Sequence, residues 1–509
     1  MIERLDPAWK TVRVTSAHLP DGPSPDAATA DPVGHRARSG GHLTVESLSP
    51  VERTFLKVSL CIGVLGVAFE MYAINSTMII IAPALNDMNH YAWAFTMFML
   101  GQVFSIIVVG RLVDRFGAFK PLAAGIIMFI IGLALAGSSH HMFTFLAARV
   151  VQGLGGGALN IALMVVVAEV FPGRQRSIMM TVFSFCYLLP AFIGPGVAAF
   201  IAVHIGWRYV FWLIIPLMAL SAIVGYVPVR KLYQGRVTRR STPGEMPLWA
   251  AVAGITGLAV IQGVTQQMGE SLGPSLLSPR WIALALAGLV AVGVAMPRLM
   301  PKGFWLFRPG MASLMWVRLM LAGAFFASSS FIVLMLTEDR GVGKERAGWA
   351  LALGAIGWVA GMVLQTRPWV RLRRDQIIVL GSALTTVAIG LIAWFAVWSR
   401  ASLHLAIGAL LLAGFGMGLG VSSTSLALMT LSPPESIGHN TSSLQVADGL
   451  GSAFFAGLAG TLLAALTRNH SLGFTFGWIY AVNALVCLAA MVLAITRLGR
   501  VRNESSGYG

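Results

Sequence analysis

The stretch GVLGVAFEMYAINSTMIIIAP, from Gly63 to Pro83, decides the class of this protein. It contains one charged residue, Glu70, in a run that is long enough to cross a bilayer core of roughly 30 Å. A surface helix of this length in a soluble protein would carry a polar face. The stretch therefore indicates a transmembrane helix, and the carboxyl group of Glu70 is the feature that needs an explanation.

The rest of the chain has the same apolar character. Its 509 residues are 56% hydrophobic and 11% charged, with a mean hydropathy of +0.77, which is typical of an all-α integral membrane protein. Apolar runs predict fourteen transmembrane helices: 56–85, 91–113, 121–139, 142–171, 177–203, 208–229, 248–268, 281–297, 312–336, 347–365, 376–398, 403–431, 441–466 and 473–497.

The positions of Lys and Arg predict the orientation. If the N-terminus is cytoplasmic, 27 of the 36 Lys and Arg residues fall on that side and seven on the other. We therefore expect a multi-pass protein of the plasma membrane with both termini in the cytoplasm. Orientation and contact with anionic membrane lipid account for the net charge of +16, so nucleic acid is not expected as a partner.

The predicted helices divide into two sets of six. Residues 51–229 hold the first set, and a charged linker at 230–247 follows it. A helical hairpin at 248–299 is inserted before the second set at 300–499. Two six-helix bundles indicate an internal duplication of the kind transporters use, with the substrate path between the halves. The segments at the two ends, 1–50 and 500–509, are expected to be a disordered cytoplasmic tail and a short cytoplasmic tail.

Three motifs lie in order along the first half. They read GRLVDRFGAFKP (110–121), RVVQGLGGG (149–157) and LLPAFIGPGVAAF (188–200). At this spacing they resemble the signature motifs of the major facilitator superfamily. From about residue 56 to 497 the chain is similar to the fourteen-helix drug:proton antiporter branch, and this resemblance implies the major facilitator fold with an inserted two-helix hairpin.

The sequence departs from the family pattern in three places. Ala118 and Phe119 follow Gly117 where basic residues are usual, and Ala198 and Ala199 replace glycines near the Gly-Pro pair. The aspartate that is familiar near the start of antiporters of this branch is absent, and Glu70 stands in its neighbourhood. These differences leave the transporter prediction in place but weaken what the resemblance says about substrate and coupling.

The first motif predicts a conformational latch. Gly110 would let two helices approach, and Gly117 would permit a tight turn. Asp114 would pair with Arg115 and with the N-terminus of the helix that begins near 440–442, where the helix dipole favours a negative charge. The resemblance implies that this contact closes the cytoplasmic side. The alternative is an ordinary solvated salt bridge, worth roughly 0–1 kcal/mol.

Three ionisable residues inside predicted spans are candidates for proton coupling. Glu70 lies near mid-depth, where a charged group normally faces a cavity or a partner. It is the principal candidate; the alternative is a permanently protonated residue bonded to Asn75 or Tyr187. Arg149 matches the family arginine near the proton site, or instead extends to the interface. Asp448 is a second proton site, part of the latch, or one half of a structural ion pair.

Arg318, early in the ninth span, is expected to be an interfacial anchor. Gly153, Gly194 and Pro195 belong to the helix-packing motifs. The cavity wall should come from the first, fourth, ninth and twelfth spans, although the same apolar residues also serve ordinary helix packing. The candidate lining residues are Met71, Asn75, Asn160, Phe325, Phe326, Phe331, Phe415 and Met417. A wall of this kind suits amphipathic compounds better than sugars.

The sequence offers little support for enzyme chemistry. It has no Gly-x-x-x-x-Gly-Lys-Ser/Thr phosphate loop and no Cys/His cluster with metal spacing, so no cofactor or metal is expected. Cys61, Cys186 and Cys487 are expected to be packing residues. The sequence thus predicts a monomeric, proton-coupled exporter of small amphipathic molecules. The rivals are a lipid or glycolipid exporter on the same fold and a transporter-derived sensor or scaffold.

Overall fold

The computed structural model describes residues 45–171, 173–233, 247–270, 279–301, 303–367, 369–370, 372–432 and 437–499. Within these ranges the regular structure is helical, with no strand, which confirms the predicted fold class. Residues 1–44 of the expected tail, 234–246 of the expected linker and 500–509 lie outside the described residues. The helices are α1 (Pro50–Ala84), α2 (Trp93–Phe116), α3 (Phe119–Gly137), α4 (Met142–Val170), α5 (Gly173–Ile201), α6 (Trp207–Tyr233), α7 (Leu248–Glu270), α8 (Pro279–Leu299), α9 (Met311–Leu334), α10 (Lys344–Leu364), α11 (Arg374–Val397), α12 (Leu403–Leu431), α13 (Ile437–Leu466) and α14 (Leu472–Arg497).

Thirteen helical segments in the described ranges are long and apolar enough to cross a membrane. One of them, Phe185–Tyr233, has 49 residues because α5 continues through the π-helical turn Ala202–Gly206 into α6. Gly206 takes a φ of +133°, which glycine tolerates best, and α5 and α6 both pack against α1. The chain therefore turns back at Gly206, and α5 and α6 correspond to two of the fourteen predicted spans. α6 extends to Tyr233, four residues into the stretch expected as linker.

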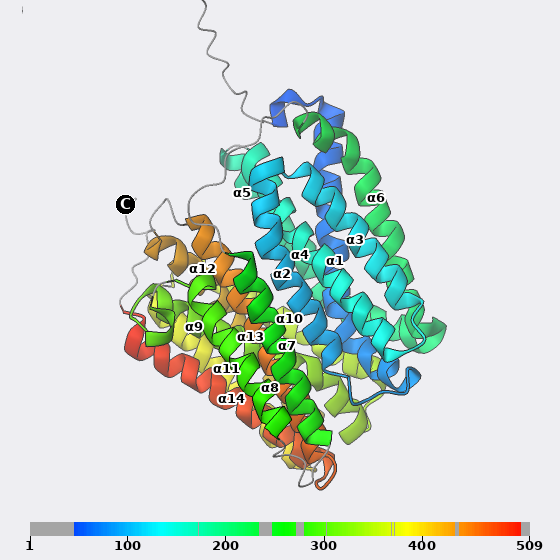
Figure 1. Ribbon diagram of the computed structural model, residues 1–509, viewed down its shortest axis with the longest axis vertical. Helices are drawn as coiled ribbons and strands as arrows, with labels where there is room; N and C mark the ends of the chain where they lie inside the picture. The colour runs from blue at the N-terminus through cyan, green and yellow to red at the C-terminus, as the bar shows by residue number, and fades with distance from the viewer. Residues whose placement is uncertain are drawn as a thin grey trace, which may run out of the picture. The chain divides into compact units, whose positions relative to one another are not determined.

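The two halves repeat one packing scheme. In the first half, α1 packs against α5 and α6, α4 against α2 and α3, and α3 against α6. In the second half, α9 packs against α13 and α14, α12 against α10 and α11, and α11 against α14. Each of these contacts of the first half thus recurs eight helices later. Figure 1 shows the two bundles, α1–α6 in blue to green and α9–α14 in yellow-green to red, with α7 and α8 side by side in green.

Two seams join the halves, α2 against α13 and α5 against α10. The inserted hairpin lies over the first seam, because α7 packs against both α13 and α2. The Gln266 side chain bonds the indole of Trp93 and donates to the carbonyl of Asn89, at 2.9 Å, while Thr265 meets Thr461 on α13 at 3.1 Å. α7 therefore forms hydrogen bonds with both halves.

We call the end of the bundle where α1 begins the inner end, because the N-terminus is expected in the cytoplasm, and the opposite end the outer end. The halves touch closely at the outer end. The Tyr91 hydroxyl donates to the Ser330 carbonyl at 3.0 Å, and its ring lies 5.6 Å from that of Phe331. On the other seam, a Cβ on Gly348 would lie 2.9 Å from the Pro195 carbonyl oxygen. This conformation is therefore closed at its outer end.

Candidate functional site

A buried ion pair joins two helices of the first half. Glu70 on α1 and Arg149 on α4 are each 1% exposed, and Arg149 Nη1 donates to Glu70 Oε1. The second carboxyl oxygen, Oε2, has no hydrogen-bond partner among the described residues. Asn75 and Tyr187, the partners considered from the sequence, are not the ones that Glu70 uses. Arg149 does not extend to the interface, so that alternative is wrong.

The arginine of this pair is held by three further groups. Its Nε donates to the Ala94 carbonyl at 3.0 Å, and Nη1 also donates to Gln152 Oε1 at 2.7 Å. The Phe98 ring lies 4.5 Å from the guanidinium carbon, within reach of a cation–π interaction. A buried charge is tolerated only with such partners, since a charge alone at this depth costs several kcal/mol. The cluster is thus a polar site in an apolar bundle, and its hydrogen bonds and ring contact compensate for the burial of Arg149.

A small pocket of about 30 Å³ connects the ion pair to the second half. Arg149 and Asn75 line it from the first half, and Ser330 and Ser452 line it from α9 and α13. A site that holds one water needs about 10–15 Å³ and two to four polar partners, and this pocket offers both. Arg149 therefore lies at the boundary between the halves, where relative movement of the two bundles would change its surroundings.

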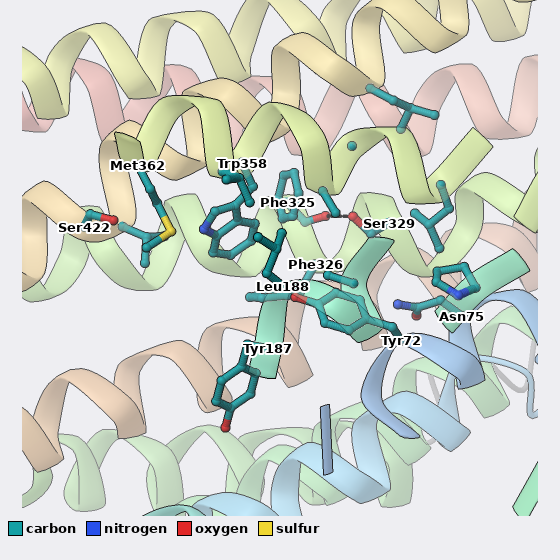
Figure 2. A pocket seen from close by; sticks show the side chains of 18 of the residues that line it. Tyr72, Asn75, Tyr187, Leu188, Phe325, Phe326, Ser329, Trp358, Met362 and Ser422 are labelled. Atoms are coloured by element: carbon teal, nitrogen blue, oxygen red, sulfur yellow. Dashed lines mark hydrogen bonds between the residues drawn. The ribbon is translucent and has the colours of Figure 1, made fainter. Parts of the chain in front are cut away.

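A larger cavity of about 560 Å³ lies between the halves. Figure 2 shows its wall, with Trp358 and Phe325 on one side and the Tyr72 ring below Phe326. The lining comes from α1, α5, α9, α10 and α12: Tyr72, Asn75, Phe185, Tyr187, Leu188, Ala191, Pro195, Phe325, Phe326, Ser329, Leu351, Gly354, Ala355, Trp358, Val359, Met362, Val363, Leu410, Val421 and Ser422. Its volume is in the range of pockets that take drug-sized ligands.

The wall of this cavity carries no charged side chain among its described lining residues. Its polar side-chain groups are the amide of Asn75, the indole N–H of Trp358, and hydroxyl groups of tyrosine and serine: Tyr72, Tyr187, Ser329 and Ser422. Glu70 is not part of the wall. It precedes Tyr72 by two positions. On a helix of 3.6 residues per turn, the side chains of residues two positions apart point in nearly opposite directions. A ligand in the cavity would therefore contact Tyr72 and not Glu70.

The candidate lining residues have different positions. Asn75, Phe325 and Phe326 line the large cavity, and Met71 lines the small pocket. Phe331 is fully buried against Tyr91, and Met417 is 1% exposed in the core. The remaining two, Asn160 and Phe415, are partly buried and lie outside the lining of both cavities.

The wall also differs from the expected set of helices. α4 contributes nothing to the described lining of the large cavity, and α5 and α10 contribute instead. The reason is packing, because α4 is enclosed by α2 and α3 and its polar side chain Arg149 faces α1. Trp358 and Met362 on α10 are lining residues that the sequence analysis missed. No pattern in the sequence distinguishes them from the packing residues around them.

A second ion pair lies in the second half. Arg318 on α9 holds Asp448 on α13 through two hydrogen bonds, of 2.5 Å and 2.7 Å. Arg318 Nη1 also donates to the Val421 carbonyl and to Thr424 Oγ1, at 2.6 Å and 2.8 Å. The expectation that Arg318 is an interfacial anchor was wrong, because the side chain turns inward to this partner. Asp448 is thus paired with Arg318 in this conformation, and its role as a second proton site or as part of the latch stays a prediction.

The loop of the first motif has the expected turn. Gly117 ends α2 with a φ of +75°, and Tyr233 packs over it. A Cβ on Gly110 would meet no atom within 4 Å, so the expected close helix approach is absent there in this conformation. Arg115 is exposed and lies over the Phe116 ring. The Asp114 side chain lies outside the described residues, and the latch stays a prediction.

The packing motifs have unequal roles. A Cβ on Gly153 would overlap the Phe98 carbonyl oxygen, so this glycine lets α4 touch the backbone of α2. A Cβ on Gly194 would make only ordinary contacts, the nearest at 3.6 Å. Pro195 lines the cavity, and its carbonyl group packs against Gly348 at the outer end of the seam.

The comparison with known families settles the class of the protein. A family-wide sequence model described as Major Facilitator Superfamily matches residues 60–456. The chain belongs to the major facilitator superfamily. This family and its fold are those of membrane transporters and not of enzymes, and the many apolar helices agree with a multi-pass transporter.

Curated relatives are similar along most of the chain. An uncharacterised transporter of this superfamily from Mycobacterium tuberculosis is 26% identical over 86% of this chain, which spans 62% of that relative's length. The multidrug transporter protein MdtP of Bacillus subtilis is 23% identical, over 82% of this chain and 76% of its own. A triacylglyceride transporter of Mycobacterium tuberculosis is 25% identical, over 87% of this chain and 93% of its own.

Solved structures share the fold. A D-xylose-proton symporter superposes with a TM-score of 0.62 at 15% identity, over 88% of this chain and 98% of its own. A peptide-bound transporter of the POT family gives the same TM-score at 15% identity, over 86% of this chain and 95% of its own. At these identities the likeness concerns the major facilitator fold alone.

Proposed function

We propose that this protein is a proton-coupled exporter of amphipathic small molecules that works by alternating access. The observation that carries the proposal is the Glu70–Arg149 pair, buried between α1 and α4 beside a cavity of about 560 Å³. A carboxyl group at this depth is costly and normally serves a proton or ion pathway. The multidrug names of two Bacillus subtilis relatives agree with this substrate class.

Coupling would act through Arg149. A proton that binds Glu70 removes the negative charge that holds the guanidinium, and Arg149 then depends on Gln152, Ala94 and the small pocket. Because that pocket is shared with α9 and α13, the change would alter the contact between the halves. Substrate and proton would thus favour different conformations of the protein, and they would not compete by direct contact at Glu70.

The proposal includes the membrane, the oligomeric state and the orientation of the protein. We place it in the plasma membrane as a monomer with both termini in the cytoplasm, which gives proton entry from the outer end and substrate entry from the inner end. Glu70 and Arg149 are then the proton-coupling residues, and the loop with Asp114 is the inner latch. Resistance to an antibiotic would follow if such a compound is among its substrates.

Substitution of Glu70 by Gln tests the proposal. In proteoliposomes with an acidic lumen, the wild-type protein should accumulate a fluorescent amphiphile, and Glu70→Gln should abolish the dependence on the pH gradient because a neutral amide cannot exchange the proton. Glu46→Gln, which alters an exposed carboxylate ahead of α1, is the control and should behave as wild type. Gradient-driven accumulation by Glu70→Gln would refute the assigned role.

Lipid export on the same fold is the second candidate. It is favoured by the relatives named triacylglyceride transporters, which match this chain over 93% of their length. The uncharged wall of the cavity is also compatible with a neutral lipid. Movement of a labelled lipid that does not respond to a pH gradient would favour this candidate over the first.

A further inference from the structure

A further pocket lies between the halves at the outer end of the bundle. Its volume is about 200 Å³. We call it the outer pocket, and we call the pocket of about 30 Å³ beside Arg149 the coupling pocket. The turn between α1 and α2 lines the outer pocket from the first half, and the outer ends of α9, α13 and α14 line it from the second. The described lining is Met88, Asn89, Tyr91, Ala92, Leu334, Glu338, Gly460, Leu463, Ala464, Thr467, Leu472 and Phe476.

The two pockets are lined by the same faces of three helices. Residues four positions apart lie on one face of a helix. Along α9 and its π-helical extension Met335–Asp339, two such positions line the coupling pocket and the next two line the outer pocket. The other two helices repeat this order. The three rows are Phe326, Ser330, Leu334 and Glu338 on α9, Ser452, Ala456, Gly460 and Ala464 on α13, and Met99, Phe95 and Tyr91 on α2 and the turn before it.

These rows place the pockets one after the other along the bundle. Eight residues separate Ser330 from Glu338, which is roughly 12 Å at a rise of 1.5 Å per residue. The junction of α2, α9 and α13 therefore carries two successive hollows between the outer surface and Arg149.

Tyr91 lies where the two pockets meet. It lines the outer pocket, and its hydroxyl donates to the carbonyl of Ser330, which lines the coupling pocket. Its ring lies 5.5 Å from that of Phe95 and 5.6 Å from that of Phe331, and the residue is 1% exposed. The Tyr91 side chain thus closes the passage between the pockets and joins the halves by the same contacts.

Glu338 is the charged residue of the outer pocket. It is exposed, and within the part of the chain that the structure describes its side chain forms no hydrogen bond or ion pair. A carboxylate at the mouth of an apolar pocket raises the local concentration of cations, protons included. The other ionisable groups at this end of the same elements are paired or exposed: Asp87 with His90 at 2.7 Å, Asp339 with Arg340 at 3.1 Å, and Arg468 and His470 after α13.

The inner end of this junction is the buried ion pair. Arg149 lines the coupling pocket and bonds Glu70, whose Oε2 has no partner among the described residues. Asn75 and Phe326 line both the coupling pocket and the large cavity. A proton that enters along the junction would therefore reach the ion pair before it reaches the substrate cavity.

We propose that the junction of α2, α9 and α13 is the proton entry pathway of the exporter, with Glu338 at its mouth and Tyr91 as its gate. This inference rests on the proposed export function and names the route of its coupling ion. When Tyr91 leaves Ser330, the two pockets join into one path for water. A hydronium ion in this path passes its proton to a carboxylate oxygen of Glu70, and a water molecule remains.

Cysteine accessibility tests the gate without any need for transport. Ser330→Cys and Ser329→Cys are a matched pair, because these neighbours are 5% and 9% exposed but line the coupling pocket and the large cavity, respectively. Each is made alone and together with Tyr91→Ala. The probe is the membrane-impermeant thiol reagent MTSET, added outside intact cells, and the protein without a new cysteine gives the background of its three native thiols.

We expect Tyr91→Ala to speed labelling of Ser330→Cys about tenfold and to leave that of Ser329→Cys within about twofold. No acceleration at Ser330→Cys, or equal acceleration at both positions, would refute the gate. If Tyr91→Ala does not fold, Tyr91→Phe decides the question. It keeps the ring and loses only the bond to the Ser330 carbonyl, so labelling should rise about threefold, and unchanged labelling would refute the gate.

Transport kinetics test the mouth of the pathway. In proteoliposomes with an acidic lumen, Glu338→Gln should slow gradient-driven accumulation of a fluorescent amphiphile about fivefold with an unchanged KM, and Glu338→Asp should restore most of the rate. Glu46→Gln, at an exposed carboxylate outside the pathway, should stay within about twofold of wild type. Equal rates in Glu338→Gln and wild type, or a change in KM alone, would refute the role of Glu338.

Failure of the exporter itself has a different result. Wild type would then accumulate no amphiphile in response to the pH gradient, while the labelling of Ser330→Cys would still respond to Tyr91→Ala. Gradient-driven transport by wild type together with labelling that ignores Tyr91→Ala would refute the pathway and leave the exporter intact.

Discussion

Helices α4 and α12 occupy equivalent places in the two halves and are built on the same glycine spacing. On α4, Cβ atoms at Gly153 and Gly157 would overlap or crowd the backbone of α2, and one at Gly155 would overlap that of α3. On α12 the same pattern follows at positions 414, 416 and 418, where the neighbours are α10, α11 and again α10. Both helices therefore lie as the central member of three closely packed helices.

The two helices differ in chemistry one turn before this pattern begins. Four residues before Gly153, α4 carries Arg149, which is paired with Glu70. Four residues before Gly414, α12 carries Leu410, which lines the large cavity. The two halves thus share the packing, while the first half carries the deeply buried charge and the second half supplies much of the apolar wall. Packing and chemistry are separable in this fold.

The largest effect should come from making α4 resemble α12. Arg149→Leu leaves Glu70 buried without its partner, and removal of one member of a buried ion pair costs about 3–5 kcal/mol. We expect a strong fall in the unfolding temperature in detergent and no gradient-driven transport. Thermal unfolding and vesicle transport measure the two effects.

The double variant Glu70→Gln with Arg149→Leu is the control for this prediction. It removes both charges, so it should recover much of the lost stability without recovering coupling. If the double variant is no more stable than Arg149→Leu, the interpretation of the pair as mutually neutralising is wrong.

The next effect concerns the shared packing. Gly153→Ala and Gly414→Ala should each destabilise the protein by about 1–3 kcal/mol, because the added methyl groups would overlap the Phe98 and Gly354 carbonyl oxygens and force the helices apart. Unfolding temperatures of the two variants should fall by similar amounts. A large effect in one half only would break the equivalence of α4 and α12.

Two glycines on the same helices are matched controls. Gly156→Ala on α4 would make ordinary contacts, the nearest at 3.5 Å, and Gly408→Ala on α12 would meet no atom within 4 Å. Both should stay within about 0.5 kcal/mol of wild type. Loss of stability at these positions would contradict the packing explanation, because alanine is otherwise the better helix former.

A smaller effect is expected from the ion pair of the second half. The Asp448 side chain is 21% exposed, and its partner Arg318 keeps bonds to the Val421 carbonyl and Thr424 after Asp448→Asn. The loss should be about 1–2 kcal/mol, between the values for exposed and buried pairs. Transport should still depend on the pH gradient, in contrast to Glu70→Gln. Uncoupled transport by Asp448→Asn would make this residue a second proton site.

The smallest effect should come from the cavity position that corresponds to Arg149. Leu410→Met conserves volume and should change stability by less than about 1.5 kcal/mol. The reshaped wall should alter the apparent affinity for the transported amphiphile roughly threefold, and the response to the pH gradient should not change. A changed pH response would mean that the wall itself takes part in coupling.

Local properties of the sequence determined the membrane fold and the family, and they singled out Glu70 as a carboxyl group inside a span. The length of each apolar run reports a span regardless of its neighbours, and a carboxyl group among apolar residues is costly wherever the helices lie. The turn at Gly117 could be predicted for the same reason, because a positive φ is a property of one residue.

The partners of the charged side chains were decided by tertiary structure alone. Glu70 and Arg149 lie 79 residues apart, and Arg318 and Asp448 lie 130 apart, so no local pattern pairs them. The cavity wall is equally non-local: Phe331 and Phe325 look alike in sequence, yet one packs on Tyr91 and the other faces the cavity. Every face of a membrane helix is apolar, and hydrophobicity therefore cannot tell which face meets lipid, protein or a substrate.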